Sequence, residues 1–100
     1  MKRLTRTTTR ALVAFLEEPS SWRYGYDLMK AAGLSSGTLY PLLARLTDDG
    51  WLESRWEESE FPGKPPRQLY RLTATGRIEA RHALERAHAS WLRPPRTSET

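Results

Sequence analysis

The chain has 100 residues, enough for one small domain with a single modest core. It contains no cysteine, which excludes disulfides and thiolate metal sites, and its formal net charge is +4. No apolar run approaches the roughly 18 residues of a membrane span, and the N-terminus lacks the apolar core of a secretory signal, so we expect a cytoplasmic protein without a membrane segment. The cations lie in separate clusters, which fits either a phosphate-binding face or ordinary surface charge.

Two helices are predicted in the first third of the chain, after a flexible basic arm over residues 1–6. The first helix should run from Thr8 to Glu18, where Pro19 stops it, with a core stripe of Leu12, Phe15 and Leu16. The second should cover Tyr24 to Ala32 and bury Leu28, Met29 and Ala32. Gly33 follows at the position of a left-handed helix cap.

A third helix is predicted from the stretch that begins at Ser35. Its apolar residues recur at the helical period, with Leu39, Leu42, Leu43 and Leu46 on one face. Ser35 or Ser36 can cap this helix, and Gly50 should end it. Pro41 would break a hydrogen bond in its second turn, so we expect a distorted start or a late one near Gly37.

A hairpin and a last helix should complete the fold. Alternating residues predict strands over Trp51–Trp56 and Gln68–Leu72, with Leu52, Ser54 and Trp56 on one side of the first strand. The segment between them is too rich in proline for a strand and forms the hairpin tip. Thr73 can cap a helix from Ala74 to Trp91, which Pro94 and Pro95 follow.

This order of elements predicts a mainly α fold with a small β-hairpin, namely a winged helix-turn-helix. In that architecture the first two helices hold the third against a small core. The third helix enters the DNA major groove, and the hairpin, or wing, reaches the neighbouring backbone phosphates or the minor groove.

Several motifs of the chain resemble those of the PadR family of transcriptional regulators. They are found in this order and spacing: Tyr24-Gly25-Tyr26-Asp27-Leu28; Gly37-Thr38-Leu39-Tyr40-Pro41-Leu42-Leu43 with Arg45-Leu46; Gly50-Trp51-Leu52; and Arg67-Gln68-Leu69-Tyr70-Arg71-Leu72-Thr73 with Gly76. The resemblance spans roughly Leu12 to Arg77. The second and fourth motifs are specific when they occur together.

The resemblance implies a homodimeric repressor that binds double-stranded DNA at a palindromic operator. It also implies a small aromatic effector that weakens DNA binding, and dimer contacts made by the last helix. The chain has a single helix after the wing and therefore resembles the short branch of the family. The implied organisation is a basic arm over 1–6, a DNA-binding domain over 7–73, a C-terminal dimerisation helix over 74–93, and a disordered tail over 94–100.

The candidate DNA contacts lie on the third helix, the wing and the start of the second helix. Ser36 is either a plain cap or a contact, and Arg45 either reaches phosphate or pairs with Asp48 or Asp49. One of Tyr24 and Tyr26 should pack in the core while the other touches phosphate. The complete candidate set is Tyr24, Ser35, Ser36, Thr38, Tyr40, Arg45, Lys64 and Arg67, with Arg3, Arg6 and Arg10 as further cations of the arm or first helix.

Trp91, Leu84 and Ala87 are the candidates for the dimer interface or an effector site. Trp91 is either an interface or core tryptophan, or it lines a cleft between subunits and stacks on a flat effector. Both alternatives place these residues on the last helix.

Other functions find less support in the sequence. His82 and His88 are six residues apart on different helix faces, which is poor spacing for metal ligands, and no catalytic or cofactor-binding motif appears. We therefore expect no enzyme, no metal and no cofactor. Two rival functions stay open: a winged-helix module that binds a protein partner instead of DNA, and a DNA-binding regulator that senses no effector.

Overall fold

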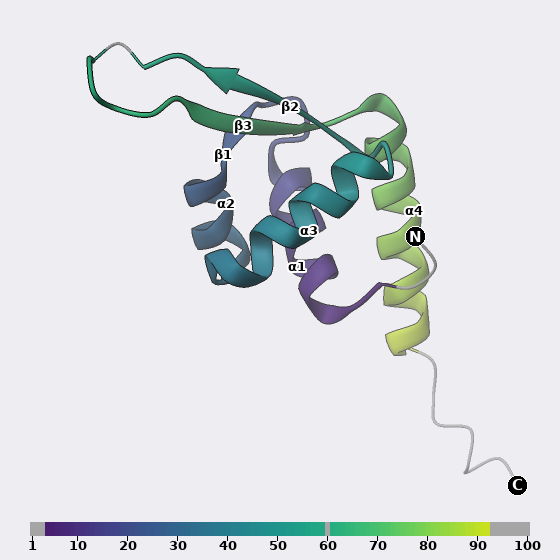
Figure 1. Cartoon of the computed structure of the whole chain (residues 1–100). Helices are drawn as coiled ribbons and strands as arrows, with labels where there is room; N and C mark the ends of the chain where they lie inside the picture. Colours follow the sequence, from purple (N-terminus) through teal and green to yellow (C-terminus); the bar gives the residue numbers. More distant parts are fainter. Residues whose placement is uncertain (1–3, 60, 93–100) are drawn as a thin grey trace, which may run out of the picture.

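The computed structural model describes residues 4–59 and 61–92, with side chains up to residue 88. The chain folds into helices packed beneath one small antiparallel sheet (Figure 1). Its elements in order are α1 (Arg6–Glu17), β1 (Arg23–Tyr24), α2 (Gly25–Ala32), α3 (Ser36–Asp48), β2 (Leu52–Glu57), β3 (Arg67–Leu72) and α4 (Ala74–Leu92). Within these described residues, each helix is too short or too polar to cross a lipid bilayer.

Helix α1 begins two residues before the predicted start. The backbone N–H of Thr8 donates to the Thr5 hydroxyl at 3.1 Å, which makes Thr5 the N-cap. Arg6 is therefore helical, so the predicted arm over 1–6 is wrong at its end, while residues 1–3 lie outside the described part. Leu12 and Phe15 are fully buried and Leu16 is half-buried, which confirms the predicted core stripe.

The turn between α2 and α3 depends on Gly33. Its φ of 69° is left-handed, and the N–H groups of Gly33 and Leu34 both donate to the carbonyl oxygen of Met29, at 2.9 and 3.1 Å. This pattern ends a helix sharply, and only glycine adopts that φ without steric cost. The predicted cap is confirmed.

Helix α3 begins at Ser36, directly after the Ser35 cap, so the expected late start near Gly37 is wrong. The Leu39 N–H already donates to the Ser35 carbonyl at 2.9 Å, and the helix continues through Pro41. The carbonyl that Pro41 cannot bond belongs to Gly37 in the first turn, where both residues are exposed and water can solvate it. The helix ends at Asp48, two residues before Gly50, whose φ of 82° turns the chain into β2.

The four leucines of α3 form the centre of the core. Leu39, Leu43 and Leu46 are fully buried and Leu42 nearly so, as the periodicity predicted. Leu52 and Leu72, from the two strands, join the same cluster together with Leu12 and Phe15 of α1. Because this stripe is buried, the opposite side of α3 faces solvent.

The sheet has three strands in the order β1-β3-β2, all antiparallel, whereas only the hairpin was predicted. The additional strand, β1, pairs Arg23 with Tyr70 and Tyr24 with Leu69. Two residues are too few to show an alternating pattern, and the predicted second helix had taken in Tyr24. Strand β2 starts one residue later than predicted and β3 one residue earlier, so Arg67 belongs to the strand and not to the loop.

The hairpin β2–β3, here called the wing (residues 52–72), has two faces of different character. The inner face packs on the helices at its base, as the burial of Leu52, Tyr70 and Leu72 shows. The outer face points away from them, although its central residue Leu69 is also buried. The paired residues of the inner face are Leu52, Ser54, Trp56, Gln68, Tyr70 and Leu72, and those of the outer face are Glu53, Arg55, Glu57, Arg67, Leu69 and Arg71.

Trp22 holds the outer face at the base of the wing. Its ring lies between two guanidinium groups, with the centroid 4.6 Å from Arg55 Cζ and 4.3 Å from Arg71 Cζ. Arg71 also forms an ion pair with Glu53 at 3.0 Å. These contacts join both long strands to the segment that leads into α2.

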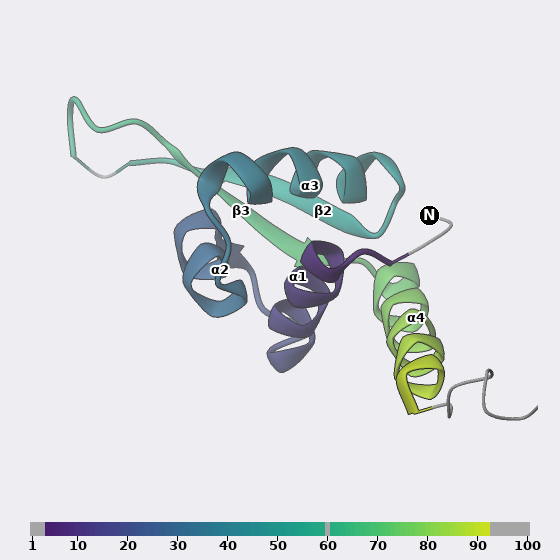
Figure 2. The same cartoon turned by 90° about the horizontal axis from the view of Figure 1, so that it is seen from below.

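Helix α4 packs at the end of the molecule opposite to the wing tip (Figures 1 and 2). The Gly76 N–H donates to the Thr73 hydroxyl at 2.8 Å, which confirms Thr73 as the cap. Ala80 and Ala83 are buried, and Leu84 and Ala87 are half-buried. Trp91 is helical, but its side chain lies outside the described residues, as does the predicted tail over 94–100.

Replacement of Trp22 by leucine should weaken the wing, because it removes both arginine–ring interactions while an apolar side chain remains. We expect the free energy of unfolding to fall by about 1–2 kcal/mol in urea denaturation. The matched control is Trp56→Leu on the same sheet. Trp56 is 63% exposed, so its replacement should change the free energy of unfolding by less than about 0.5 kcal/mol. Equal decreases in the two variants would contradict the clamping role of Trp22.

Candidate nucleic-acid interface

The first turn of α3 carries a group of exposed hydroxyls. Ser35, Ser36 and Thr38 are all exposed. Ser35 occupies the N-cap position without a side-chain capping bond, and its hydroxyl donates to Thr38 Oγ1 at 3.2 Å. Ser36 is the first helical residue and therefore not the cap. The backbone N–H groups at this end of the helix give it a partial positive charge, which favours a negatively charged ligand.

Tyr40 lies against the start of α2. A Cβ added at Gly25 would overlap the Tyr40 hydroxyl and lie 2.8 Å from its Cζ atom, so the absence of a side chain at Gly25 makes room for the ring. Tyr40 is nevertheless 42% exposed, and Gly25 is buried. Burial, and then the nearby Tyr40, raise the pKa of Tyr70 on the inner face of the wing. Tyr40 thus packs the start of α3 against α2.

Arg45 is exposed on α3, near the end of the helix. Of the two alternatives, pairing with Asp48 or Asp49 does not occur, since the ion pair among the described residues joins Arg71 and Glu53. The Arg45 guanidinium is therefore not held by either aspartate.

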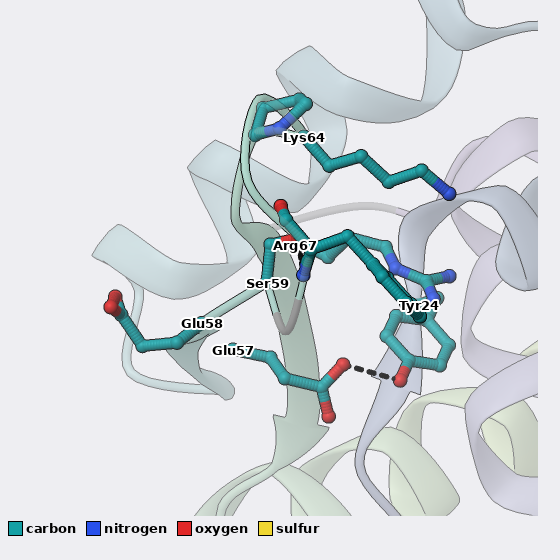
Figure 3. A pocket seen from close by; sticks show the side chains of 8 residues that line it. Tyr24, Glu57, Glu58, Ser59, Lys64 and Arg67 are labelled. Atoms are coloured by element: carbon teal, nitrogen blue, oxygen red, sulfur yellow. Dashed lines mark hydrogen bonds between the residues drawn. The ribbon is translucent and has the colours of Figure 1, made fainter.

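Tyr24, Glu57 and Arg67 form a cluster where the wing leaves the body of the protein (Figure 3). The Tyr24 hydroxyl donates to Glu57 Oε1 at 2.6 Å, and the Arg67 guanidinium lies 4.4 Å from the centre of the Tyr24 ring. The bond to Glu57 is the main cause that raises the pKa of Tyr24 above its ordinary value. Arg67 and Glu57 are also direct partners across the strands.

Neither Tyr24 nor Tyr26 belongs to the hydrophobic core, so the prediction that one of them packs there is wrong. Tyr26 is the exposed one, at 64%, and its ring lies 5.4 Å from the Lys30 ammonium. Tyr24 is half-buried, and its hydroxyl is engaged by a carboxylate. A phosphate contact by Tyr24 would have to replace that bond.

Lys64 lies in the wing loop beside a shallow hollow of about 410 Å³. Its ammonium is 5.3 Å from the centre of the Phe61 ring. Figure 3 shows Lys64 and Arg67 on the same side of the hollow, whereas Glu58 points away from them. The residues lining the hollow are Tyr24, Glu57, Glu58, Ser59, Phe61, Lys64, Pro65 and Arg67.

The start of α3 and the wing lie on the same side of the molecule. In Figure 1 both are found at the left, and Figure 2, turned by 90°, shows the wing tip and α3 along one edge with α1, α2 and α4 below them. A rod-shaped ligand could therefore touch both elements at once. The predicted contacts on α3 and the wing are thus brought together, while Leu84, Ala87 and Trp91 on α4 are at the other end.

The sequence reasoning missed three residues that shape this region: Trp22, Gly25 and Glu57. The spacing of Trp22 and Tyr24, two residues apart, would have placed both rings on one face of a strand, had β1 been recognised. Among residues 4–59 and 61–88, no group of three His, Cys, Asp or Glu side chains is placed to hold a metal ion. His82 and His88 are both exposed on α4.

Comparison with known proteins identifies the fold and the family. The model of the transcriptional regulator PadR-like family matches residues 12–82. A PadR-like transcription factor from Bacteroides fragilis is 33% identical over 86% of this chain and 82% of its own, with a TM-score of 0.62. A PadR family regulator from Eggerthella lenta is 31% identical over 84% of this chain and 76% of its own, with a TM-score of 0.69.

A more distant match shows the likeness of the fold alone. The PcaV transcriptional regulator from Streptomyces coelicolor, solved in complex with its natural ligand, is 24% identical over 98% of this chain and 67% of its own, with a TM-score of 0.64. The search of curated proteins gave no significant match. The family model covers most of the chain and agrees with both the winged helix and the motifs on α3 and β3. The chain belongs to the PadR-like family of transcriptional regulators, which are DNA-binding proteins and not enzymes.

Proposed function

We propose that this regulator is a homodimeric repressor that binds a palindromic operator in the cytoplasm and releases it when a small aromatic effector binds. One observation carries the DNA-binding part: the exposed start of α3 and the wing lie on the same side of the molecule. The direction of regulation, the dimer and the effector are what the family resemblance implies.

The start of α3 supplies the groups that would read the major groove. Ser36, Thr38 and Tyr40 are exposed hydroxyl carriers at the positive end of a helix whose other side is buried. Hydroxyls can bond to phosphate oxygens as well as to base edges, and the helix end favours the approach of a polyanion. Arg45, further along α3, is exposed, so its guanidinium is available for a phosphate of the DNA backbone.

The wing would supply backbone contacts beside the helix. Lys64 and Arg67 are exposed, and both lie over aromatic rings, which limit their movement without neutralising their charge. Such contacts contribute affinity for any sequence and make binding depend on salt. Arg6 and Arg10, both exposed on α1, are further candidates for phosphate contacts.

Helix α4 is the proposed dimer element. It has a 54% exposed isoleucine, Ile78, and the half-buried Leu84 and Ala87 further along. Because α4 is at the end opposite to the wing, two chains joined through it would leave both α3 helices free. In a symmetric dimer the two helices would then read half-sites about one helical turn apart.

The test of this function is binding of the full chain to the DNA upstream of its own gene, at two salt concentrations, against an unrelated duplex. We expect specific binding of two chains per site. Replacing Lys64 and Arg67 together by alanine should weaken binding to both duplexes, and should reduce the salt slope by about one unit for each phosphate that is no longer neutralised. An unchanged slope would place the wing off the DNA. No affinity for any duplex would favour the rival function, a module that binds a protein partner.

Tyr40 and Gly25 provide a second test, directed at α3. Gly25→Ala should push the Tyr40 ring aside, because the added Cβ occupies the place of its hydroxyl. Operator affinity should fall in Gly25→Ala and in Tyr40→Phe, while the melting temperature of Tyr40→Phe stays near that of the wild type. The double variant should bind little more weakly than the weaker single variant, since both changes remove the same interaction. Additive effects would show that Tyr40 does not act through this position.

The effector can be tested through Trp91. Planar aromatic compounds should release the wild-type protein from its operator, and Trp91→Ala should respond only at much higher concentration. Trp91→Phe, which keeps a ring for stacking, is the matched control and should respond almost as the wild type does. Release should be followed by DNA binding, because four tryptophans would confuse a fluorescence signal. Equal responses of the wild type and Trp91→Ala would refute the role of Trp91.

A further inference from the structure

The inner face of the wing has a large aromatic side chain that the core does not use. Trp56 is 63% exposed, although it lies on the same face as the buried Leu52, Tyr70 and Leu72. Trp56 is the second-last residue of β2 and does not belong to the hydrophobic core, and the wing extends beyond the helices toward its tip (Figure 1). A single exposed aromatic is common on protein surfaces, so the significance of Trp56 depends on what surrounds it.

A line of polar groups connects Trp56 with α3. Its direct partner on β3 is Gln68, whose amide accepts a bond from the Tyr70 hydroxyl at 3.0 Å and donates to the Ser54 hydroxyl at 3.3 Å. Tyr70 in turn lies near Tyr40 of α3. The inner face thus runs without interruption from the proposed recognition helix to the exposed indole.

Charge distinguishes this face from the other one. The six paired residues of the inner face include no charged side chain, whereas the outer face has Glu53 and Glu57. Two cations of the outer face, Arg55 and Arg71, lie against the ring of Trp22. A polyanion would meet carboxylates on the outer face but none among the paired residues of the inner one.

We propose that Trp56 is a DNA-contact residue, whose indole packs against the sugars of the DNA backbone next to the wing. This inference rests on the proposed function and adds an apolar contact to it. Gln68 acts as a positioning residue, since its two hydrogen bonds fix the strand directly opposite Trp56. A second copy joined through α4 would not cover the indole, because α4 lies at the other end of the molecule.

An apolar contact has a signature that differs from that of a cation. Removing it lowers affinity but leaves the number of released counterions unchanged, so the salt slope should stay the same. Covering roughly half of the exposed indole corresponds to about a tenfold change in affinity. Lys64→Ala, in contrast, should change both the affinity and the slope.

The experiment measures operator affinity of Trp56→Ala, Trp56→Phe and the wild type at several salt concentrations. Trp56→Ala should bind about tenfold more weakly with an unchanged slope, and Trp56→Phe should recover most of the affinity. Val13→Ala is the control, because Val13 is also an exposed apolar residue, at 46%, but lies on α1 outside the wing, and its truncation should leave the affinity unchanged. Affinity of Trp56→Ala within twofold of the wild type would overturn the inference while leaving the proposed function intact.

A second experiment uses the wild-type protein, so its result does not depend on whether the variants fold correctly. Hydroxyl-radical oxidation of Trp56 should be strongly reduced when the operator is bound, while oxidation of Met29, which is half-buried on α2 and has no part in the proposed DNA or dimer contacts, should not depend on DNA. Equal oxidation of Trp56 with and without bound operator would refute the contact. If the wild-type protein binds no DNA at all, the proposed function fails, and this inference fails with it.

Discussion

The pairing of β1 with β3 fixes the wing relative to the helix-turn-helix. Arg23 and Tyr24 directly precede α2, and they pair with the central strand of the sheet. The Arg23 guanidinium also donates to the Ala14 carbonyl of α1 at 2.8 Å, so three elements meet at this strand. Tyr24 has three roles. It is the N-cap residue of α2, its ring lies under the Arg67 guanidinium, and its hydroxyl donates to Glu57. Without this short strand, the wing would be joined to the helices only through the core at its base.

The two faces of the wing have different roles: the outer face stiffens the hairpin, and the inner face is available for contact with a partner. On the outer face, arginine side chains lie against the rings of Trp22 and Tyr24, and Arg71 forms an ion pair with Glu53. Such contacts are individually weak at exposed sites, but together they hold a hairpin that few apolar residues support. On the inner face, Gln68 bonds to the hydroxyls of Ser54 and Tyr70, and the exposed indole of Trp56 is left for a partner. A hairpin held in this way presents the same surface in each encounter, which reduces the entropic cost of binding.

The core and the order of helices could be predicted from periodicity, because burial of the α3 leucines leaves a repeating signal. Gly33 was predicted for the same kind of reason, since a left-handed cap needs a residue without a side chain. The start of α3 was not, because the tolerance of Pro41 depends on solvent around the Gly37 carbonyl, which a sequence pattern does not encode. The contacts of Trp22, Tyr24 and Glu57 join segments more than 30 residues apart, so no local pattern reveals them. The side chains on which the wing depends were therefore the least predictable part of the site.

The position of α4 restricts how an effector signal could reach the DNA. Among the described elements, α4 packs against α1 and β3, and it lies far from the start of α3. A ligand bound at α4 would act on DNA binding only if it favoured one arrangement of the two chains over another, or if it moved β3. Since β3 pairs with both other strands, a shift of β3 would displace β1 and the wing together. A dimer that rotates about α4 needs no such internal change, because tilting two rigid domains already separates one α3 helix from its half-site.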